Sequence, residues 1–489
     1  MDHAAAQCHD SEMPHLSALH EVDEHLQGLH SRKSSLLNEI ERIERQIQLA
    51  QTRRATLYND AAPISKLPHE LLSFIFLMAR EEYTRGSLPL QVIVSHVSSR
   101  WRAVAINTPL LWTDIRVSLT LKNAKKPAAL DSRRDGFVTY LTRSNNRAFN
   151  LRMECNGDFA IEPFLVALDT HMHRCSRLTF TISNHRQPAL TLQRCLRLTE
   201  APILEHLSIH IPDSRLYEYP KRQFGVIQPN MLESGAPALR FLRLTGMAGH
   251  LQPPLTMVTT LHLDGRSMDD LSFRQFRDIL QSTPNLESLS LNQVWVGMSP
   301  VAPIAIPKLR SLRVRNVLEY NLQPLLSTLP LSQLESCIMS QVFFFPPLEC
   351  PNVKKLTLDE CSVVPGEVGN LIEAYPTIES LTISAGDPAT IFFILGSPGN
   401  PIWWPKLKRL YLMDLPFRDV DLFVQKIRSK QATDSRLETL YLDRKSRGVL
   451  RLKQQLDAVR LLLPVEKYED IAPWPTGLGF EDDDDGFWS

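Results

Sequence analysis

The pattern Pro-x-Leu-x-x-Leu-x-Leu occurs as PNLESLSL at residues 284–291 and again as PKLRSLRV at residues 307–314. Five further copies with the proline are PILEHLSI (202–209), PALRFLRL (237–244), PNVKKLTL (351–358), PTIESLTI (376–383) and PKLKRLYL (405–412). Three copies lack the proline: VTTLHL (258–263), LESCIM (334–339) and LETLYL (437–442). Alternating apolar side chains indicate a short strand with one buried face. The sequence therefore predicts ten strands between residues 202 and 442.

Apolar residues at helical spacing precede several of these strands, at residues 276–280, 322–329, 368–375 and 420–427. A helix followed by a short strand forms one α/β unit, and neither element can bury its apolar face alone. The copies mostly follow one another after 19–30 residues, which is close to the period of leucine-rich repeats. We therefore predict an irregular, leucine-rich-repeat-like α/β solenoid, or horseshoe, over residues 146–463. An ordinary mixed α/β domain is the alternative.

The side chains between and after the repeat leucines face the opposite side of each strand. In a horseshoe this side is the concave face, and its mixture of charges, amides and rings suits a protein target. The predicted target surface consists of Arg243, His262, Asp264, Asn292, Arg313, Arg315, Asp359, Tyr411, Tyr441 and Asp443. A solvated sheet face is the alternative for each residue. The Asn or Cys that usually stands three residues beyond the last repeat leucine occurs once, as Cys361, so the turns must satisfy their backbone groups otherwise.

Residues 19–57 carry a heptad pattern in which ten of twelve seam positions are apolar and Lys33 and Arg54 fill the other two. A 3.5-residue repeat keeps one stripe facing a partner helix. We expect a coiled-coil helix over residues 16–60 after a disordered segment at residues 1–15. This helix would associate with a second copy or a partner helix; the alternative is a solitary amphipathic helix packed on the body.

A compact helical module is predicted over residues 63–113, followed at residues 114–145 by a connector that includes the first irregular strand. It reads LPHELLSFIF (67–76) and, after a polar break, VSHVSSRWRAVAINTPLLW (94–112). Pro68 suits the first turn of a helix, where its missing N–H has no partner. About fifty residues are marginal for a free-standing core, so a module like this gains stability by packing on a partner.

The Leu-Pro start, the Arg100–Trp101 pair and the Pro-x-x-Trp end together resemble an F-box, in the form found in large fungal, basidiomycete-type families. Those families also carry a heptad helix before the box, whereas Ser98 stands where they often have Cys. The resemblance implies a dock for the Skp adaptor of a cullin-type ubiquitin ligase. The residues that it assigns to the adaptor are Leu67, Pro68, Leu71, Leu72, Ile75, Phe76, Val97, Trp101, Pro109, Leu110, Leu111 and Trp112. The alternative is that most of them form the module's own core.

The composition argues against several other functions. Lys plus Arg equals Asp plus Glu at 54 each, so no global field favours nucleic acid or a membrane surface. No apolar stretch reaches transmembrane length, and the start of the chain lacks the pattern of a signal peptide. Seven scattered cysteines without a CxxC pair indicate reduced thiols, and we expect a cytoplasmic or nuclear protein. The final segment, 464–489, ends in the acidic run EDDDDGFWS and is expected to be solvated.

No GxGxxG, GxxxxGK[ST], HExxH or GxSxG motif occurs, so we expect no cofactor and no enzyme. His171, His173 and Cys175 alternate as if along one strand, but no fourth metal ligand accompanies them. The sequence thus favours a substrate adaptor of an SCF-type ubiquitin ligase, bound to a Skp–cullin complex and a protein target. The alternatives are a repeat scaffold without a ubiquitin link and a hydrolase on an α/β fold.

Overall fold

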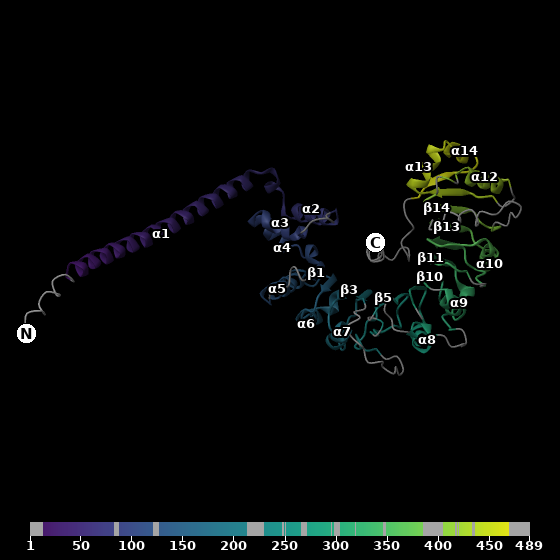
Figure 1. Ribbon diagram of the computed structural model, residues 1–489, viewed down its shortest axis with the longest axis horizontal. Coiled ribbons are helices and arrows are strands. Elements are labelled where there is room, and N and C mark those ends of the chain that lie inside the picture. Colours follow the sequence, from purple (N-terminus) through teal and green to yellow (C-terminus); the bar gives the residue numbers. More distant parts are fainter. Residues whose placement is uncertain are drawn as a thin grey trace, which may run out of the picture. The chain divides into compact units, whose positions relative to one another are not determined.

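The computed structural model describes residues 13–82, 88–120, 127–212, 229–246, 249, 251–265, 271–294, 296–297, 304–317, 319–345, 349–384, 404–415, 418, 420–432 and 436–468 (Figure 1). The chain divides into two compact units, Met1–Leu111 and Trp112–Ser489. The predicted disordered start and acidic tail lie mostly outside the described residues.

The first unit begins with one long helix, α1 (Met13–Ala61), which confirms the predicted N-terminal helix. Its one proline, Pro14, stands in the first turn, and every residue from 17 to 58 is exposed. Within the first unit, the described residues therefore leave this apolar stripe uncovered. No helix among the described residues combines the length and the apolarity that crossing a membrane requires.

The rest of the first unit contains short helices: η1 (Pro63–Lys66), α2 (His69–Glu82), α3 (Leu90–Val97), α4 (Ser99–Ile106) and η2 (Pro109–Trp112). The sequence favours one helical stretch across residues 90–105, but the structure has two helices there. Ser98 adopts an extended backbone and its side chain accepts a hydrogen bond from the Trp101 amide, so it caps α4.

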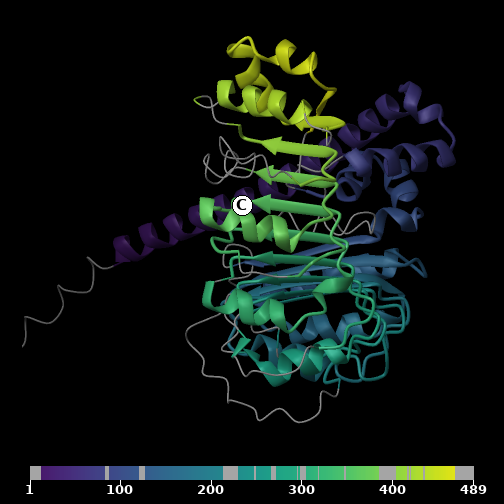
Figure 2. The same ribbon diagram turned by 90° about the vertical axis from the view of Figure 1, so that its right-hand side faces the viewer.

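The second unit contains a single open sheet of fourteen parallel strands, which Figure 2 shows stacked as arrows of one direction. Its strands follow chain order: β1 (Asp114–Thr120), β2 (Phe149–Asn156), β3 (Cys175–Ser183), β4 (His206–Ile211), β5 (Phe241–Gly246), β6 (Thr260–Asp264), β8 (Ser288–Asn292), β10 (Ser311–Arg315), β11 (Ser336–Ser340), β12 (Lys355–Asp359), β13 (Ser380–Ser384), β14 (Arg409–Met413), β15 (Thr439–Leu442) and β16 (Val465–Lys467). All ten predicted strands are present, as β4–β6, β8 and β10–β15. The α/β class is confirmed.

Helices and turns return the chain from one strand to the next: α5 (Pro127–Arg143), α6 (Glu162–Asp169), η3 (Met172–Arg174), α7 (Pro188–Leu196), α8 (Phe273–Gln281), α9 (Glu319–Ser327), η5 (Leu331–Gln333), η6 (Pro365–Glu367), α10 (Val368–Ala374), α12 (Val420–Gln431), α13 (Arg444–Leu452) and α14 (Leu456–Arg460). A separate two-stranded sheet pairs β7 (Leu271–Ser272) with β9 (Val296–Gly297). The four predicted helices are α8, α9, α10 and α12.

The core lies between the returning helices and one face of the sheet. The repeat leucines stand in register across neighbouring strands, so Leu289 pairs with Leu261 on one side and with Leu312 on the other. These positions and the apolar residues of the helices form one continuous buried cluster. Each unit therefore buries its apolar face against the next, as the repeat pattern predicts.

The turns after the strands satisfy their backbone groups without an asparagine or cysteine ladder. The residue after a strand takes a left-handed conformation and donates its amide to the last carbonyl of the next strand. Four turns follow this rule: Gln293 to Arg315 (2.9 Å), Asn316 to Ser340 (3.0 Å), Gln341 to Asp359 (2.9 Å) and Glu360 to Ser384 (3.1 Å). Cys361 adds a thiol contact of 3.2 Å from its Sγ to the Met339 carbonyl. Hydrogen bonds between backbone groups of successive turns therefore take the place of the asparagine or cysteine ladder.

The limits of the sheet differ from the prediction. Residues 114–145 contain the expected irregular strand as β1, which pairs with β2 from Asp114 opposite Asn150, but the rest is not a plain connector, because it includes the helix α5. The run IRVSLT (115–120) alternates buried and more exposed side chains as a strand does, but it has only one leucine and does not follow the Pro-x-Leu-x-x-Leu-x-Leu pattern. The sheet also extends past residue 463, since β16 pairs with β15.

Candidate functional site

The inner face of the helical module is a small apolar core. Leu72 and Phe76 of α2 are buried, as is Leu111 of η2. The ring of Trp101 on α4 is half-buried and lies with its centroid 4.9 Å from that of Phe76. Leu72, Phe76 and Leu111 therefore stabilise the module itself, and we remove them from the predicted adaptor surface.

Arginines hold the segments that flank these helices. Arg100 donates hydrogen bonds to the backbone carbonyls of Ser65 and Leu67, which fixes the Leu-Pro start of the module. Arg80 of α2 donates to the carbonyl of Leu110. Arginine suits this task because its guanidinium presents several donors in a fixed plane. The Arg-Trp pair thus has a physical role, with Arg100 fixing the start of the module and Trp101 packing on Phe76.

The outer face of α2 carries a second apolar stripe that the module does not bury. Leu71, Phe74, Ile75 and Met78 are 51%, 59%, 41% and 49% exposed. Their spacing of three, one and three residues places them on one side of the helix. We call these four residues the outer stripe. Leu71 and Ile75 are among the predicted adaptor residues, whereas Phe74 and Met78 are not, although the same spacing marks them.

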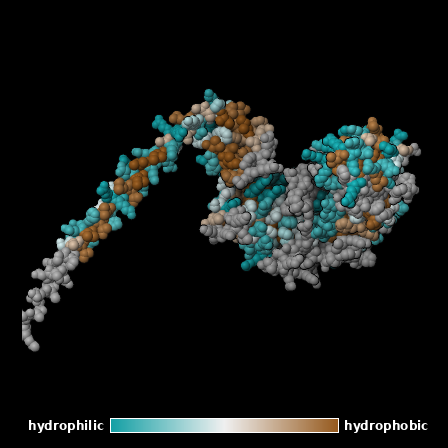
Figure 3. Space-filling view, turned by 45° about the horizontal axis from the view of Figure 1, so that its top comes forward, coloured by the Kyte–Doolittle hydropathy of each residue, from teal (hydrophilic) through white to brown (hydrophobic). Residues whose placement is uncertain are grey.

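Further apolar residues of the first unit are exposed around its loops and helix ends. Val97 and Leu110, both predicted adaptor residues, are exposed, and so is Pro68, while Leu67 and Pro109 are half-buried. Figure 3 shows hydrophobic residues gathered on the helical module. Soluble proteins rarely expose a large contiguous apolar patch unless it binds something. The module therefore presents a surface suited to another apolar surface.

Trp112 does not belong to that surface. It is 1% exposed and falls in the second unit. The Trp112 ring meets the ring of Tyr140 edge-on, with 5.1 Å between the two centroids. The Arg143 guanidinium lies 4.5 Å from the centre of the Trp112 ring. The predicted role of Trp112 in adaptor binding is replaced by a role in packing α5 at the start of the sheet.

The predicted target residues lie on the strands, or directly after one, as expected, but most of them are buried. Arg243, His262 and Arg313 occupy one row of the register across β5, β6 and β10, through Ser290 of β8. The next row contains Asp264, Asn292, Arg315 and, across Ser340, Asp359. Six of the ten are buried within this chain: Arg243, His262, Asp264, Asn292, Arg315 and Asp443. The half-buried remainder is Arg313, Asp359, Tyr411 and Tyr441.

Asp443 has a structural role in place of the predicted contact with a target. Its carboxylate accepts hydrogen bonds from the amides of Lys445 (3.0 Å) and Ser446 (2.9 Å) and so caps α13. Asp359 keeps a position on the sheet face, where burial raises the pKa of its carboxyl. The sequence could not separate these cases, because Asp follows a repeat leucine in both.

Two tyrosines form a flat aromatic platform near the end of the sheet. The rings of Tyr411 and Tyr441 stack at 4.2 Å between centroids with planes 6° apart. Tyr468 meets Tyr411 edge-on at 5.0 Å. Tyrosine is enriched where proteins bind proteins, because it offers a large rigid surface with a polar end. Tyr411 and Tyr441 are half-buried, as are Arg313 and Asp359, whereas the other predicted target residues are buried.

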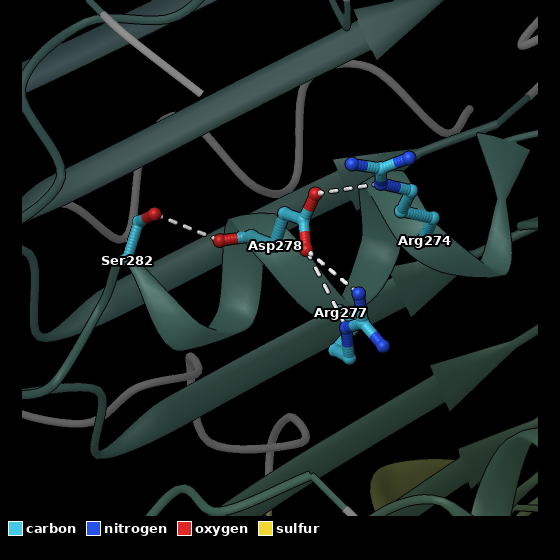
Figure 4. Close-up of polar contacts among 4 residues, drawn as sticks. All are labelled: Arg274, Arg277, Asp278 and Ser282. Atoms are coloured by element: carbon cyan, nitrogen blue, oxygen red, sulfur yellow. Dashed lines mark hydrogen bonds and ion pairs between the residues drawn. The ribbon is translucent and has the colours of Figure 1, made fainter. Parts of the chain in front are cut away.

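Other clusters on the described residues have structural explanations. Figure 4 shows Asp278 of α8 with Arg274 and Arg277: its carboxylate lies 3.9 Å and 3.4 Å from their guanidinium nitrogens, and the Ser282 hydroxyl donates to its carbonyl at 2.8 Å. The Arg274–Asp278 pair is four residues apart, a spacing at which opposite charges stabilise a helix. His173 lies in η3 and Cys175 begins β3 with its thiol buried, so the expected alternation along one strand is wrong. The described residues contain no group of three side chains able to hold a metal ion.

Comparison of the chain with models of protein families and with curated proteins finds no match.

Proposed function

We propose that this chain is the substrate-recognition adaptor of an SCF-type (Skp–cullin–F-box) ubiquitin ligase, and that it acts by binding two proteins rather than by catalysis. The outer stripe of α2 carries the proposal. It places four large apolar side chains in water on a helix whose other face already fills the core of the module. Exposure on this scale is expected where a partner covers the surface.

The Skp adaptor would cover the outer stripe and the exposed Val97 and Leu110. Burying the remaining half of four large apolar side chains is worth about 3–6 kcal/mol before the entropy of association is subtracted. Arg100 supports this dock by holding the backbone at Leu67. This arrangement fits the interpretation of the module as an F-box, in which the Leu-Pro start and α2 contact the adaptor.

The second unit would act as a leucine-rich-repeat-like horseshoe that binds the target protein. An open parallel sheet whose strands follow chain order is what such a solenoid requires. The stacked rings of Tyr411 and Tyr441, together with Arg313 and Asp359, would make the first contacts with the target protein. We place the complex in the cytoplasm or the nucleus, where cullin-type ligases act.

The test is the affinity of the full chain for a purified Skp adaptor. Ile75→Glu introduces a charge into the middle of the outer stripe, and we expect it to weaken binding about 30-fold or more. Leu461→Glu is the matched control, because Leu461 is an equally apolar exposed residue in the second unit. Both variants should keep the circular dichroism and melting temperature of the wild type. If the wild type itself does not bind, the repeat scaffold without a ubiquitin link is the better description.

A further inference from the structure

The seam of α1 shows how the long helix would pair. Nine of its large apolar residues, between Leu19 and Leu57, are 44–63% exposed. Figure 3 shows hydrophobic residues recurring along the visible side of this helix. The stripe continues for about 57 Å at ~1.5 Å per residue, which is longer than a small domain can cover. A second helix of similar length is the occupant that matches it.

Three seam positions are weak, and they decide the orientation. Lys33 and Arg54 are charged and Ala50 is small. In a parallel pair of identical chains each seam position faces itself. Lys33 would then face Lys33, Arg54 would face Arg54, and Ala50 would face Ala50 across a gap. A parallel pair therefore has two repulsive layers and one underfilled layer among its twelve.

An antiparallel pair of the same chain avoids all three defects. Full overlap of the seam pairs Leu19 with Leu57 of the other copy, about a midpoint at residue 38. Each weak position then faces a large aliphatic one: Lys33 faces Ile43, Ala50 faces Leu26 and Arg54 faces Val22. The long stems of Lys33 and Arg54 can lie along these aliphatic side chains while their charges reach water.

We propose that α1 pairs with α1 of a second copy as an antiparallel two-stranded coiled coil in this register. The pairing rests on the seam alone and is independent of the proposed ligase function. In this pair the C-terminal end of α1, which leads into the helical module, lies at one end of the coiled coil in one copy and at the opposite end in the other copy. One assembly would then present two adaptor sites and two target-binding sheets.

Disulfide crosslinking of the full chain tests the orientation. The Cys8→Ser and Cys195→Ser changes are made first, because Cys8 lies outside the described residues and Cys195 is partly exposed, whereas the other five cysteines are buried. Leu19→Cys and Leu57→Cys are then made separately in that background. A disulfide requires Cα atoms within about 7 Å. We expect a crosslinked dimer only when the two variants are mixed, with the disulfide joining residue 19 to residue 57. Crosslinking of each variant with itself would overturn the proposal.

A second measurement does not depend on new cysteines. Light scattering should give a molar mass twice the 55.7 kDa of one chain. Exchange of equal amounts of differently tagged wild-type and Lys33→Glu chains should then give wild-type homodimer, heterodimer and variant homodimer in a 1:2:1 ratio, because residue 33 faces Ile43 in every species. A strong excess of heterodimer would show that residue 33 faces residue 33, and a monomer or a trimer would contradict the pairing itself.

Discussion

The guanidinium of Arg143 lies 4.5 Å from the centre of the Trp112 ring, with Tyr140 edge-on against the same ring. Tyr140 and Arg143 both come from α5, the helix that returns from the first strand. Trp112 therefore belongs to the start of the sheet, although the sequence pattern predicts it at the end of the helical module. This division between interior and surface residues determines what each substitution should do.

Trp112→Phe should reduce stability and leave adaptor binding unchanged. Phenylalanine keeps a ring for Tyr140 and Arg143 but leaves part of the space empty, so we expect the free energy of unfolding to fall by about 1–2 kcal/mol. Urea unfolding measures this change. The affinity for the Skp adaptor should stay within twofold of the wild type, and a loss comparable to that of Ile75→Glu would return Trp112 to the interface.

Gln293→Gly should stabilise the protein. Gln293 has a φ of 52° in the turn after β8, a backbone conformation that costs a residue with a Cβ about 1 kcal/mol or more relative to glycine. We expect the free energy of unfolding to rise by about 0.5–1 kcal/mol in urea. Gly265→Ala provides the opposite case, because a Cβ at residue 265 would collide with the Gln293 carbonyl. It should destabilise by more than 1 kcal/mol, and equal effects of the two variants would contradict this view of the turns.

Lys430→Met should stabilise the protein in a pH-dependent way. Lys430 is buried, its ammonium donates to the Trp404 carbonyl at 3.4 Å, and burial lowers its pKa from 10.5 to about 8. Below pH 8 both states carry the proton, and the folded state bears the cost of the buried charge. Between pH 8 and 10.5 the unfolded state binds more protons, so wild-type stability rises with pH. Methionine should add about 1–3 kcal/mol at pH 7, with a smaller gain at pH 9.5.

The buried cysteines should resist alkylation while the protein is folded. Burial raises the pKa of Cys155 to about 11 and the pKa of Cys350 and Cys361 to about 12. Only the thiolate reacts, so very little reactive form exists at pH 8. Iodoacetamide should modify these residues only in denaturant, as mass spectrometry of the peptides would show. Rapid modification of the folded protein would mean that the sheet core opens easily.

The repeat strands were predictable because strict alternation of leucines has one physical meaning, a strand with one buried face. The strands β2 and β3 were not located, and β1 was expected only as an irregular strand, because each of these three contains a single leucine and none follows the Pro-x-Leu-x-x-Leu-x-Leu pattern. The backbone hydrogen bonds that link successive turns could not be predicted, because they depend on residues at positive φ, where Gln and Glu are uncommon. In α2 both faces are apolar, so spacing alone could not show that Leu72 is buried while Leu71 is exposed.

The most direct test of the central claim is a calorimetric titration of a purified Skp adaptor into the full chain. We predict saturable binding of one adaptor per chain with a dissociation constant below about 1 µM, corresponding to roughly 8 kcal/mol. The heat capacity change should be negative, because binding buries the apolar outer stripe of α2. Absence of binding with both proteins at 100 µM or above would contradict the assignment of this chain as a ligase adaptor.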